Sequence, residues 1–271
     1  MNHRPVTRRT PNIRRANSAR GHGRVEDNDT VFTDADAAAL YDLQNPWHAD
    51  RFPSDAFYDR LVMAADSVLD VGCGTGGMLH TARARGHTGR LVGLDPDAAA
   101  LDRARRRTDI EWVTGVAAQA SWDREFELAT MAGHAFQCLI DDDEVRASLA
   151  AIRSSLRDGG RFAFETRHPQ ARAWERWTRR AKIADAGGRT LLVMRRVDSV
   201  AGDVVTLTST TSDEMGRTLR VAHSRYRFLD VPTLDAFLTG AGLAVEARYG
   251  DWQHGPITDR SDEIVTIARR T

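Results

Sequence analysis

The stretch SVLDVGCGTGGM, residues 67–78, constrains the fold of this chain more than any other segment. Its first five residues have the apolar character of a buried strand, and its glycines permit a tight turn before a helix. Backbone in such a turn approaches a ligand closely, and the N-terminus of the following helix favours negative charge. The stretch therefore predicts a nucleotide site at the end of a strand in an α/β sheet.

The glycine spacing fits two kinds of site. Gly72, Gly74 and Gly77 match G-x-G-x-x-G, whereas Gly72, Gly74 and Gly76 match G-x-G-x-G. Asp95 lies 23 residues beyond Gly72, at the end of the next predicted strand, where a carboxylate accepts hydrogen bonds from both ribose hydroxyls. These residues predict an adenosine ligand without naming it, and NAD is one candidate.

The order of elements predicts a doubly wound, mostly parallel sheet. Short apolar runs alternate with helical patterns, and such crossovers join parallel strands. An antiparallel β meander follows, with no helix between its strands. The expected strands are 67–71, 91–95, 110–113, 127–131, 161–166, 243–249 and 263–269, the expected helices are 77–85, 97–107, 142–157 and 232–241, and the meander occupies about 190–229.

Composition narrows the class of protein. The chain has 271 residues and zero formal net charge, so its net charge provides no electrostatic attraction for nucleic acid or for a membrane surface. Its two cysteines cannot build a disulfide framework, which favours a cytoplasmic location.

We divide the chain into a leader (1–30), a helical cap (31–66) and a main domain (67–271). The first 24 residues carry seven arginines and no acid, and we interpret them as a disordered leader; a transit peptide or a phosphate-binding arm is the alternative.

Asp70 helps to decide between the two kinds of site. It stands two residues before the first glycine, where a dinucleotide with its diphosphate gains little from another anion. A carboxylate there suits a cofactor with an amino or sulfonium group. The single predicted sheet also leaves no second domain for hydride chemistry.

Four features together resemble class I S-adenosylmethionine-dependent methyltransferases, in particular the bacterial small-molecule branch. They are VLDVGCGTG, GLDPD, MAGHAFQ (131–137) and the closing strand pair. The resemblance runs from about Tyr41 to the C-terminus and implies a Rossmann-like methyltransferase fold whose antiparallel insert covers the substrate. YDLQNPW (41–47) resembles a segment that closes over the cofactor in that branch.

The resemblance implies S-adenosyl-L-methionine as cofactor and assigns its contacts. Asp95 would bind the ribose diol with Pro96 against the adenine, and the Ala117 N–H would reach an adenine nitrogen. Where the family often has an acid for the adenine amino group, this chain has Val116. Either Gln119 or a water would substitute, or packing would hold the adenine. The full set of implied cofactor residues is Tyr41, Asp70, Gly72, Cys73, Gly74, Gly76, Asp95, Pro96, Ala117, Met131 and Ala132.

Methyl transfer is an in-line displacement, and a hydroxyl acceptor needs a base whereas an amine must only arrive unprotonated. His134 and His168 follow the fourth and fifth strands, so we predict them as catalytic residues; a capping or packing role for His134 stays open. Arg167 could hold an anionic group of the substrate. The predicted substrate-binding residues are Trp47, Phe136, Arg167, Trp174, Trp177, Tyr249 and Trp252.

We therefore predict methyl transfer to a small-molecule acceptor, with no metal and no membrane partner, by a monomer or homodimer. Whether oxygen, nitrogen or carbon is methylated stays open. The alternatives are a nucleic-acid methyltransferase, an NAD-dependent oxidoreductase and a non-catalytic cofactor-binding subunit.

Overall fold

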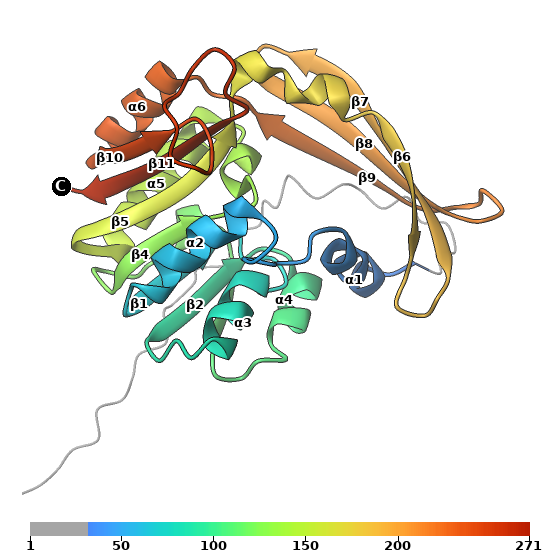
Figure 1. Ribbon diagram of the computed structural model, residues 1–271, viewed down its shortest axis with the longest axis horizontal. Helices are drawn as coiled ribbons and strands as arrows, with labels where there is room; N and C mark the ends of the chain where they lie inside the picture. The colour runs from blue at the N-terminus through green and yellow to red at the C-terminus, as the bar shows by residue number, and fades with distance from the viewer. Residues whose placement is uncertain (1–31) are drawn as a thin grey trace, which may run out of the picture.

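The computed structural model describes residues 32–271, and the predicted leader (1–30) lies outside these residues. A seven-stranded sheet forms the body, in the order β10-β11-β5-β4-β1-β2-β3 (Figure 1). β11 runs antiparallel to both its neighbours, and the other strands are mutually parallel, which confirms the predicted fold class. The strands are β1 (Ser67–Val71), β2 (Arg90–Asp95), β3 (Glu111–Thr114), β4 (Phe126–Met131), β5 (Leu156–Arg167), β10 (Leu243–Tyr249) and β11 (Glu263–Arg270).

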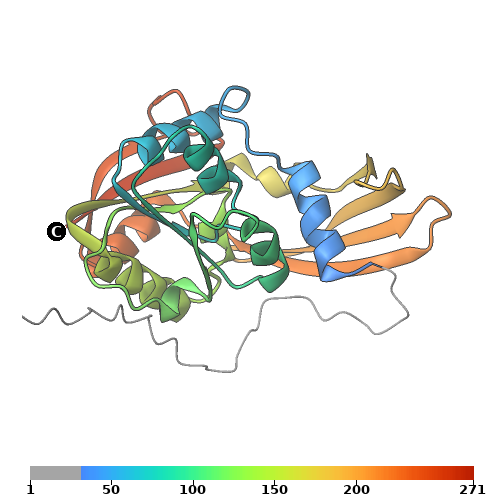
Figure 2. The same ribbon diagram turned by 90° about the horizontal axis from the view of Figure 1, so that it is seen from below.

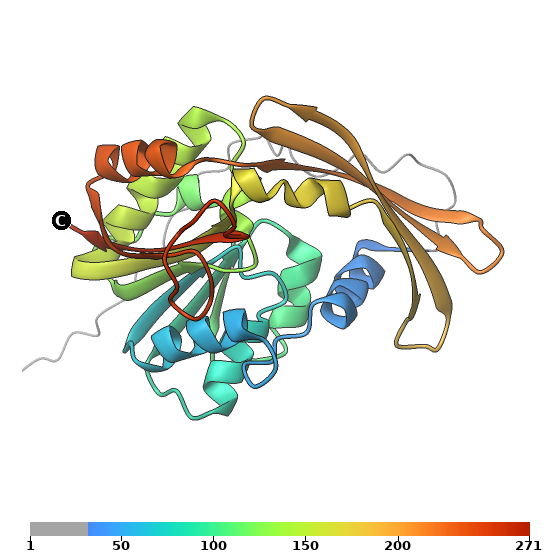
Figure 3. The same cartoon turned by 45° about the horizontal axis from the view of Figure 1, so that its top comes forward.

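Helices cover both faces of this sheet because β1 carries apolar side chains on both. Val68 packs with Phe57 and Leu79 on one face, and Leu69 belongs to the core on the other, together with Leu149. Figure 3 shows the two helical layers from a tilted view. One layer comprises α2 (Pro53–Met63), α3 (Gly77–Ala84) and α4 (Ala98–Ala104), and the other comprises the 3₁₀ helix η1 (Ala117–Gln119), α5 (Asp142–Ser155) and α6 (Val231–Gly240).

The strand order reverses between β1 and β4. β1 pairs with β2 on one side and β4 on the other, so the loops after these strands diverge from a common edge. Ligands of open α/β sheets bind at such a switch point, beyond the carboxyl ends of the strands. This edge therefore holds the candidate site.

A second, antiparallel sheet, here the cover sheet, consists of β6 (Arg179–Ala184), β7 (Thr190–Ala201), β8 (Val204–Asp213) and β9 (Thr218–Arg227). The sequence predicts only the last three strands. β6 reads RRAKIA, which lacks the alternation of a half-buried strand because this edge strand is exposed along nearly its whole length. The insert therefore begins earlier than predicted.

Helix α1 (Asp34–Gln44) packs against the cover sheet. It begins with a capping box between Thr33 and Asp36. Leu40 belongs to a small apolar cluster with Leu191 and Val193 of β7. Figure 2 shows the cover sheet projecting from the body with α1 beside it.

Candidate active site

The glycine loop, residues 72–76, follows β1 at the edge of the sheet. Gly72, Gly74 and Gly76 have φ angles of +77°, +54° and +82°, which L side chains rarely adopt. A Cβ at Gly76 would lie 2.5 Å from the Trp112 ring, whereas a Cβ at Gly74 would meet no atom within 4 Å. Gly76 is thus required for packing, and the space beside Gly74 is accessible to a ligand.

Asp95 fixes this loop to the end of β2. Its Oδ2 accepts a hydrogen bond from the Gly74 N–H at 2.7 Å, and its Oδ1 accepts from the Asp97 N–H at 2.8 Å. Carboxylate oxygens at the end of β2 are the kind of acceptor that a ribose diol requires. The geometry suits a carboxylate that positions the loop and binds a hydroxylated ligand.

Asp70 is a buried acid beneath the same loop. It is 3% exposed, and its Oδ1 accepts a hydrogen bond from the Thr130 hydroxyl at 2.9 Å. Burial raises the pKa of the Asp70 carboxyl to about 7, opposed by the Thr130 hydrogen bond and helped by Asp95 and Glu165. A cation nearby would favour the ionised form, as expected for a site that receives a positively charged group.

Helix α1 contacts the glycine loop through Asp42. The Thr75 hydroxyl donates to Asp42, and Arg103 of α4 donates to the same carboxylate from Nε at 2.7 Å. The neighbouring Tyr41 exposes 51% of its surface. α1 is therefore held against the loop and against α4 at once.

A network of hydrogen bonds fixes His134 beyond β4. Its backbone N–H donates to Glu165 Oε1 at 2.6 Å, and its Nε2 lies 3.0 Å from Glu263 Oε2. Tyr58 of α2 donates to the other oxygen of Glu165. His134 has a φ of +63°, which is uncommon outside glycine, and the network holds it there. The imidazole Nδ1 also lies 3.8 Å from Glu165, so both ring nitrogens face carboxylates.

Residues 68–160 match the family described as Methyltransferase domain. This segment contains β1 to β4, the glycine loop, Asp95 and His134, and the fold around it agrees with the match. The chain is an S-adenosylmethionine-dependent methyltransferase. Its cofactor is S-adenosyl-L-methionine, which sets aside the NAD alternative left by the glycine spacing.

Three known proteins are similar to this methyltransferase. The cypemycin N-terminal methyltransferase of a Streptomyces species is 26% identical over 220 residues, which cover 75% of this chain and 83% of that protein. The 2-phytyl-1,4-naphtoquinone methyltransferase of Thermosynechococcus vestitus is 34% identical over 117 residues, 41% of this chain and 51% of the relative. The amino pentose methyltransferase CalS10 of Micromonospora echinaspora shares the fold, with a TM-score of 0.63 and 24% identity over 90% of this chain and all of CalS10.

The two predicted histidines have different surroundings in the methyltransferase. His134 lies in the carboxylate network, whereas His168 Nδ1 accepts the Gln170 N–H at 3.1 Å and so caps the 3₁₀ helix η3 (Pro169–Ala171). Burial lowers the pKa of His168. His134 stands at the N-cap position of the 3₁₀ helix η2 (Ala135–Cys138), but its side chain makes no capping hydrogen bond there.

Arg167 lies at the end of β5, near the network. Its Nη1 donates to Gln137 Oε1 at 2.9 Å, and its guanidinium lies 5.0 Å from the centre of the Trp177 ring. Burial lowers the pKa of Arg167, while Glu263 raises it. Trp177 also contacts Tyr226 of the cover sheet at 5.5 Å between ring centroids. Arg167 therefore connects the body with the cover sheet beside the site.

The remaining predicted aromatic residues divide into three groups. Phe136 differs from the expectation of a substrate contact, because it is 2% exposed and stacks on Phe164 in the core. Trp174 packs edge-on against Phe228, away from the glycine loop. The third group surrounds the buried helix α2: Trp47 and Trp252 contact Tyr58, and Tyr249 contacts Phe57.

The adenine end of the predicted cofactor site lies at β2 and η1. Ala117 is buried at the start of η1, and Pro96 is exposed directly after Asp95. Val116 exposes 39% of its surface where the family often has an acid. At the methionine end, Met131 is buried as the last residue of β4, and Ala132 follows it.

Sequence reasoning missed Glu165, Glu263, Tyr58 and Asp42. Glu165 carried a signal, since an acid within the apolar strand FAFET must find a buried partner. Asp42 and Glu263 carried no local sequence signal, because their partners lie far away in the sequence.

Among residues 32–271 there is no group of three or more His, Cys, Asp or Glu side chains suited to a metal ion, and no described helix is long and apolar enough to cross a membrane.

Proposed function

We propose that this methyltransferase transfers a methyl group to the amine nitrogen of a small molecule. The observation that carries the proposal is the position of His134, whose ring nitrogens face Glu165 and Glu263. S-adenosylmethionine supplies an electrophilic methyl group on its sulfonium. The protein must therefore bring a neutral nitrogen into line with that group and accept a proton.

Residues at the sheet edge would bind different parts of the cofactor. The backbone of Gly72–Gly76 and Asp95 would bind the methionine and ribose parts of the cofactor, and Asp70 would face its amino group. Pro96 and Ala117 would contact the adenine, with Met131, Ala132 and Tyr41 at the borders. These roles follow the family resemblance, and the open space at Gly74 and the burial of Asp70 support them.

Glu263 would attract a protonated amine to the site because carboxylates attract organic cations. The acceptor loses a proton to Glu263 or to bulk water before or as nitrogen attacks, and a new N–C bond forms as the C–S bond breaks. His134 holds the Glu263 carboxylate in place through Nε2, and Glu165 faces the other ring nitrogen of His134. Arg167 and Trp177 would contact the remainder of the acceptor, where their charge and ring face select polar or aromatic groups.

The names of the relatives agree with an amine acceptor in two cases. One is named for methylation at an N-terminus and another is named an amino pentose methyltransferase, whereas the third is named for a quinone. A bacterial source and a cytoplasmic location are also part of the proposal, supported by the bacterial relatives and two free cysteines. Either a monomer or a homodimer is compatible with it.

The proposal is tested with pairs of acceptors that differ only by an amine or a hydroxyl on one scaffold, incubated with methyl-labelled cofactor. Amino sugars, peptides with free N-termini and phenolic amines form a suitable first panel. We expect label on the amine of at least one pair and none on its hydroxyl partner. Preferential labelling of hydroxyls, or cofactor binding without transfer to any amine in the panel, would contradict the proposal.

Glu263→Gln sharpens the test. We expect kcat on the amine acceptor to fall about 100-fold, the low end for a lost proton-transfer group, with affinity for S-adenosylhomocysteine unchanged. Glu246→Gln is the matched control, because Glu246 is a β10 carboxylate paired with Arg161 and Arg269 instead of with His134. Equal activity in the two variants would remove the role assigned to Glu263.

A further inference from the structure

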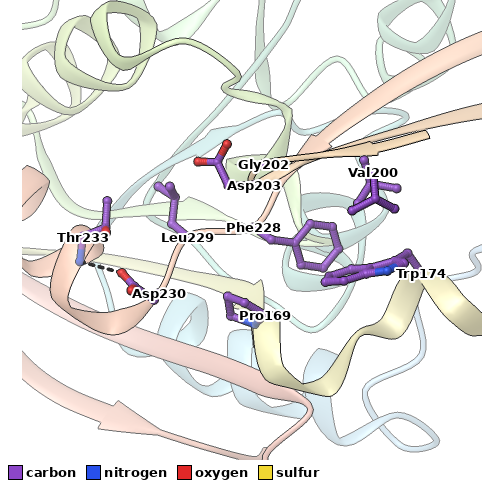
Figure 4. A pocket seen from close by; sticks show the side chains of 10 residues that line it. Pro169, Trp174, Val200, Gly202, Asp203, Phe228, Leu229, Asp230 and Thr233 are labelled. Atoms are coloured by element: carbon purple, nitrogen blue, oxygen red, sulfur yellow. Dashed lines mark hydrogen bonds between the residues drawn. The ribbon is translucent and has the colours of Figure 1, made fainter.

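A cavity of about 290 Å³ lies apart from the glycine loop, where the cover sheet joins the body (Figure 4). Three segments enclose it: the 3₁₀ region after β5, the turn between β7 and β8, and the connection from β9 to α6. Its volume is near the lower limit for pockets that bind small molecules. The lining residues are Pro169, Trp174, Val200, Gly202, Asp203, Val205, Phe228, Leu229, Asp230 and Thr233.

The cavity has an aromatic wall. Trp174 belongs to the 3₁₀ helix η4 (Ala173–Arg176), and its ring meets Phe228 edge to face, with centroids 4.6 Å apart. Val205, Phe228 and Leu229 are almost wholly buried, so this wall is a fixed part of the core. An apolar or aromatic body could pack against it with little reorganisation.

The charged groups of the cavity are two carboxylates. Asp230 caps α6 by accepting the Thr233 N–H at 2.9 Å, and it makes no ion pair within residues 32–271. Hydrogen bonds from the Thr233 side chain and from its backbone N–H lower the pKa of Asp230, so the group is charged at neutral pH. Asp203 accepts from Arg227 Nε at 2.7 Å, but Arg227 also binds Asp142.

The charges around the cavity are therefore unbalanced. Arg227 pairs with Asp203 and with Asp142, and Asp142 also pairs with Arg146. Asp230, in contrast, pairs with no cationic side chain within residues 32–271, and its charge is met by the N-terminus of α6. Carboxylates beside an aromatic face form the usual environment for organic cations, since both attract positive charge. An anion would be repelled by Asp203 and Asp230.

We propose that this cavity is a second ligand site, which takes an organic cation with an apolar or aromatic body. The body packs against Trp174 and Phe228, and the cationic group lies beside Asp230. This site adjoins the proposed acceptor site, because Phe228 also packs against Trp177, with ring centroids 5.8 Å apart. It has its own charged groups, since Asp203 and Asp230 belong to neither the glycine loop nor the His134 network. The proposal therefore stands whatever the acceptor is.

Both connections between the body and the cover sheet border the cavity. η4 leads into β6, and β9 leads through Phe228 and Leu229 into α6. A ligand here would contact both connections at once and restrict movement of the cover sheet against the body. We expect an occupied cavity to favour one orientation of the cover sheet.

The test uses three probes of nearly equal size: 2-phenylethylammonium, 2-phenylethanol and 3-phenylpropanoate, titrated calorimetrically into the full chain saturated with S-adenosylhomocysteine. We expect the cation to bind about three- to fivefold more tightly than the alcohol, and the anion more weakly than both. Equal binding of cation and alcohol, or no binding of the cation at about 5 mM, would overturn the proposal.

Variants locate the bound probe. Asp230→Asn retains the helix cap and should abolish the difference between cation and alcohol, whereas Trp174→Leu should weaken both. Asp213→Asn, at the distant end of β8, is the matched control and should leave binding unchanged. Cation binding that is lost in Glu263→Gln but retained in Asp230→Asn would place the probe in the acceptor site. That result would refute the proposal that the cavity binds the cation.

Discussion

Asp95 illustrates how one carboxylate can have two functions at the cofactor loop. It holds Gly74 and Asp97 by their backbone N–H groups, and its position at the end of β2 suits a ribose diol. We therefore propose that structural and binding roles coincide in this side chain. Substitution should affect ligand affinity more than folding, because both hydrogen-bonded N–H groups are at the edge of the sheet, within reach of water.

Asp95→Ala should weaken binding of S-adenosylhomocysteine by about 1.5–3 kcal/mol, the scale for a lost charged acceptor. Isothermal titration calorimetry measures the change. Asp102→Ala is the control, since Asp102 is an exposed α4 carboxylate paired with Arg105. Unchanged affinity in Asp95→Ala would reject the ribose role.

Asp70 links cofactor binding to pH. Its pKa is about 7 in the folded protein and 3.8 in the unfolded chain, so ionisation costs the folded state free energy. The stability that this group contributes is greatest below the unfolded pKa and is lost as pH rises from about 4 to about 7. Asp70→Asn, which cannot ionise, should be free of this loss.

We therefore expect the cofactor-free Asp70→Asn protein to gain stability relative to the parent by about 1–2 kcal/mol between pH 5.5 and pH 7, with no further gain at higher pH. Urea unfolding at several pH values checks this. The same variant should bind S-adenosylmethionine more weakly at pH 8, because it lacks the carboxylate that we propose faces the amino group. A variant with parental affinity and parental pH dependence would exclude both roles.

At the scale of elements, α1 depends on a single carboxylate for its contact with the cofactor loop. Asp42→Ala would remove the hydrogen bond to Thr75 and the ion pair with Arg103 together. We expect affinity for S-adenosylhomocysteine to fall by about 1–2 kcal/mol, through faster dissociation. Stopped-flow displacement measures the rate.

Asp34→Ala is the matched control on the same helix. Asp34 is exposed and pairs with Arg220 of the cover sheet, away from the glycine loop. If both variants released the ligand equally fast, α1 would act by its overall stability instead of by the Asp42 contact.

The elements themselves were largely predictable. β1, at Ser67–Val71, and β10, at Leu243–Tyr249, have the predicted bounds because turn residues end both. β6 was missed because an exposed edge strand needs no apolar alternation. The predicted helix 142–157 ends at Ser155 instead, since β5 begins at Leu156, before the predicted strand 161–166.

The site was predictable only where its chemistry lies in one local motif. The glycine loop and Asp95 belong to neighbouring β-α units of known geometry. Glu263 reaches His134 across 129 residues, and its partner is decided by the antiparallel placement of β11 against β5. Such a contact requires the complete topology, which local patterns do not contain.

At the scale of the whole molecule, the arginine-rich leader is the segment without an assigned role. We expect deletion of residues 1–24 to leave thermal stability and cofactor affinity nearly unchanged. Thermal unfolding and calorimetry of the shortened chain check this. A large loss of either quantity would make the leader part of the folded unit.

The same shortened chain tests the nucleic-acid alternative. RNA binding that falls steeply with salt in the full chain and disappears on deletion would indicate an electrostatic arm. In that case the preference for a small acceptor would have to be revised.

The cover sheet leaves the body after η4 and returns at α6, so its four strands form one continuous segment, residues 179–227. The cofactor loop, Asp95 and the His134 network all lie outside that segment. The cover sheet could thus be exchanged as one cassette, provided that its contacts with α1 through Asp34 and Leu40 are kept, because α1 also holds the glycine loop through Asp42. Related enzymes with the same architecture would be natural sources of replacement cassettes for engineering new acceptor preferences.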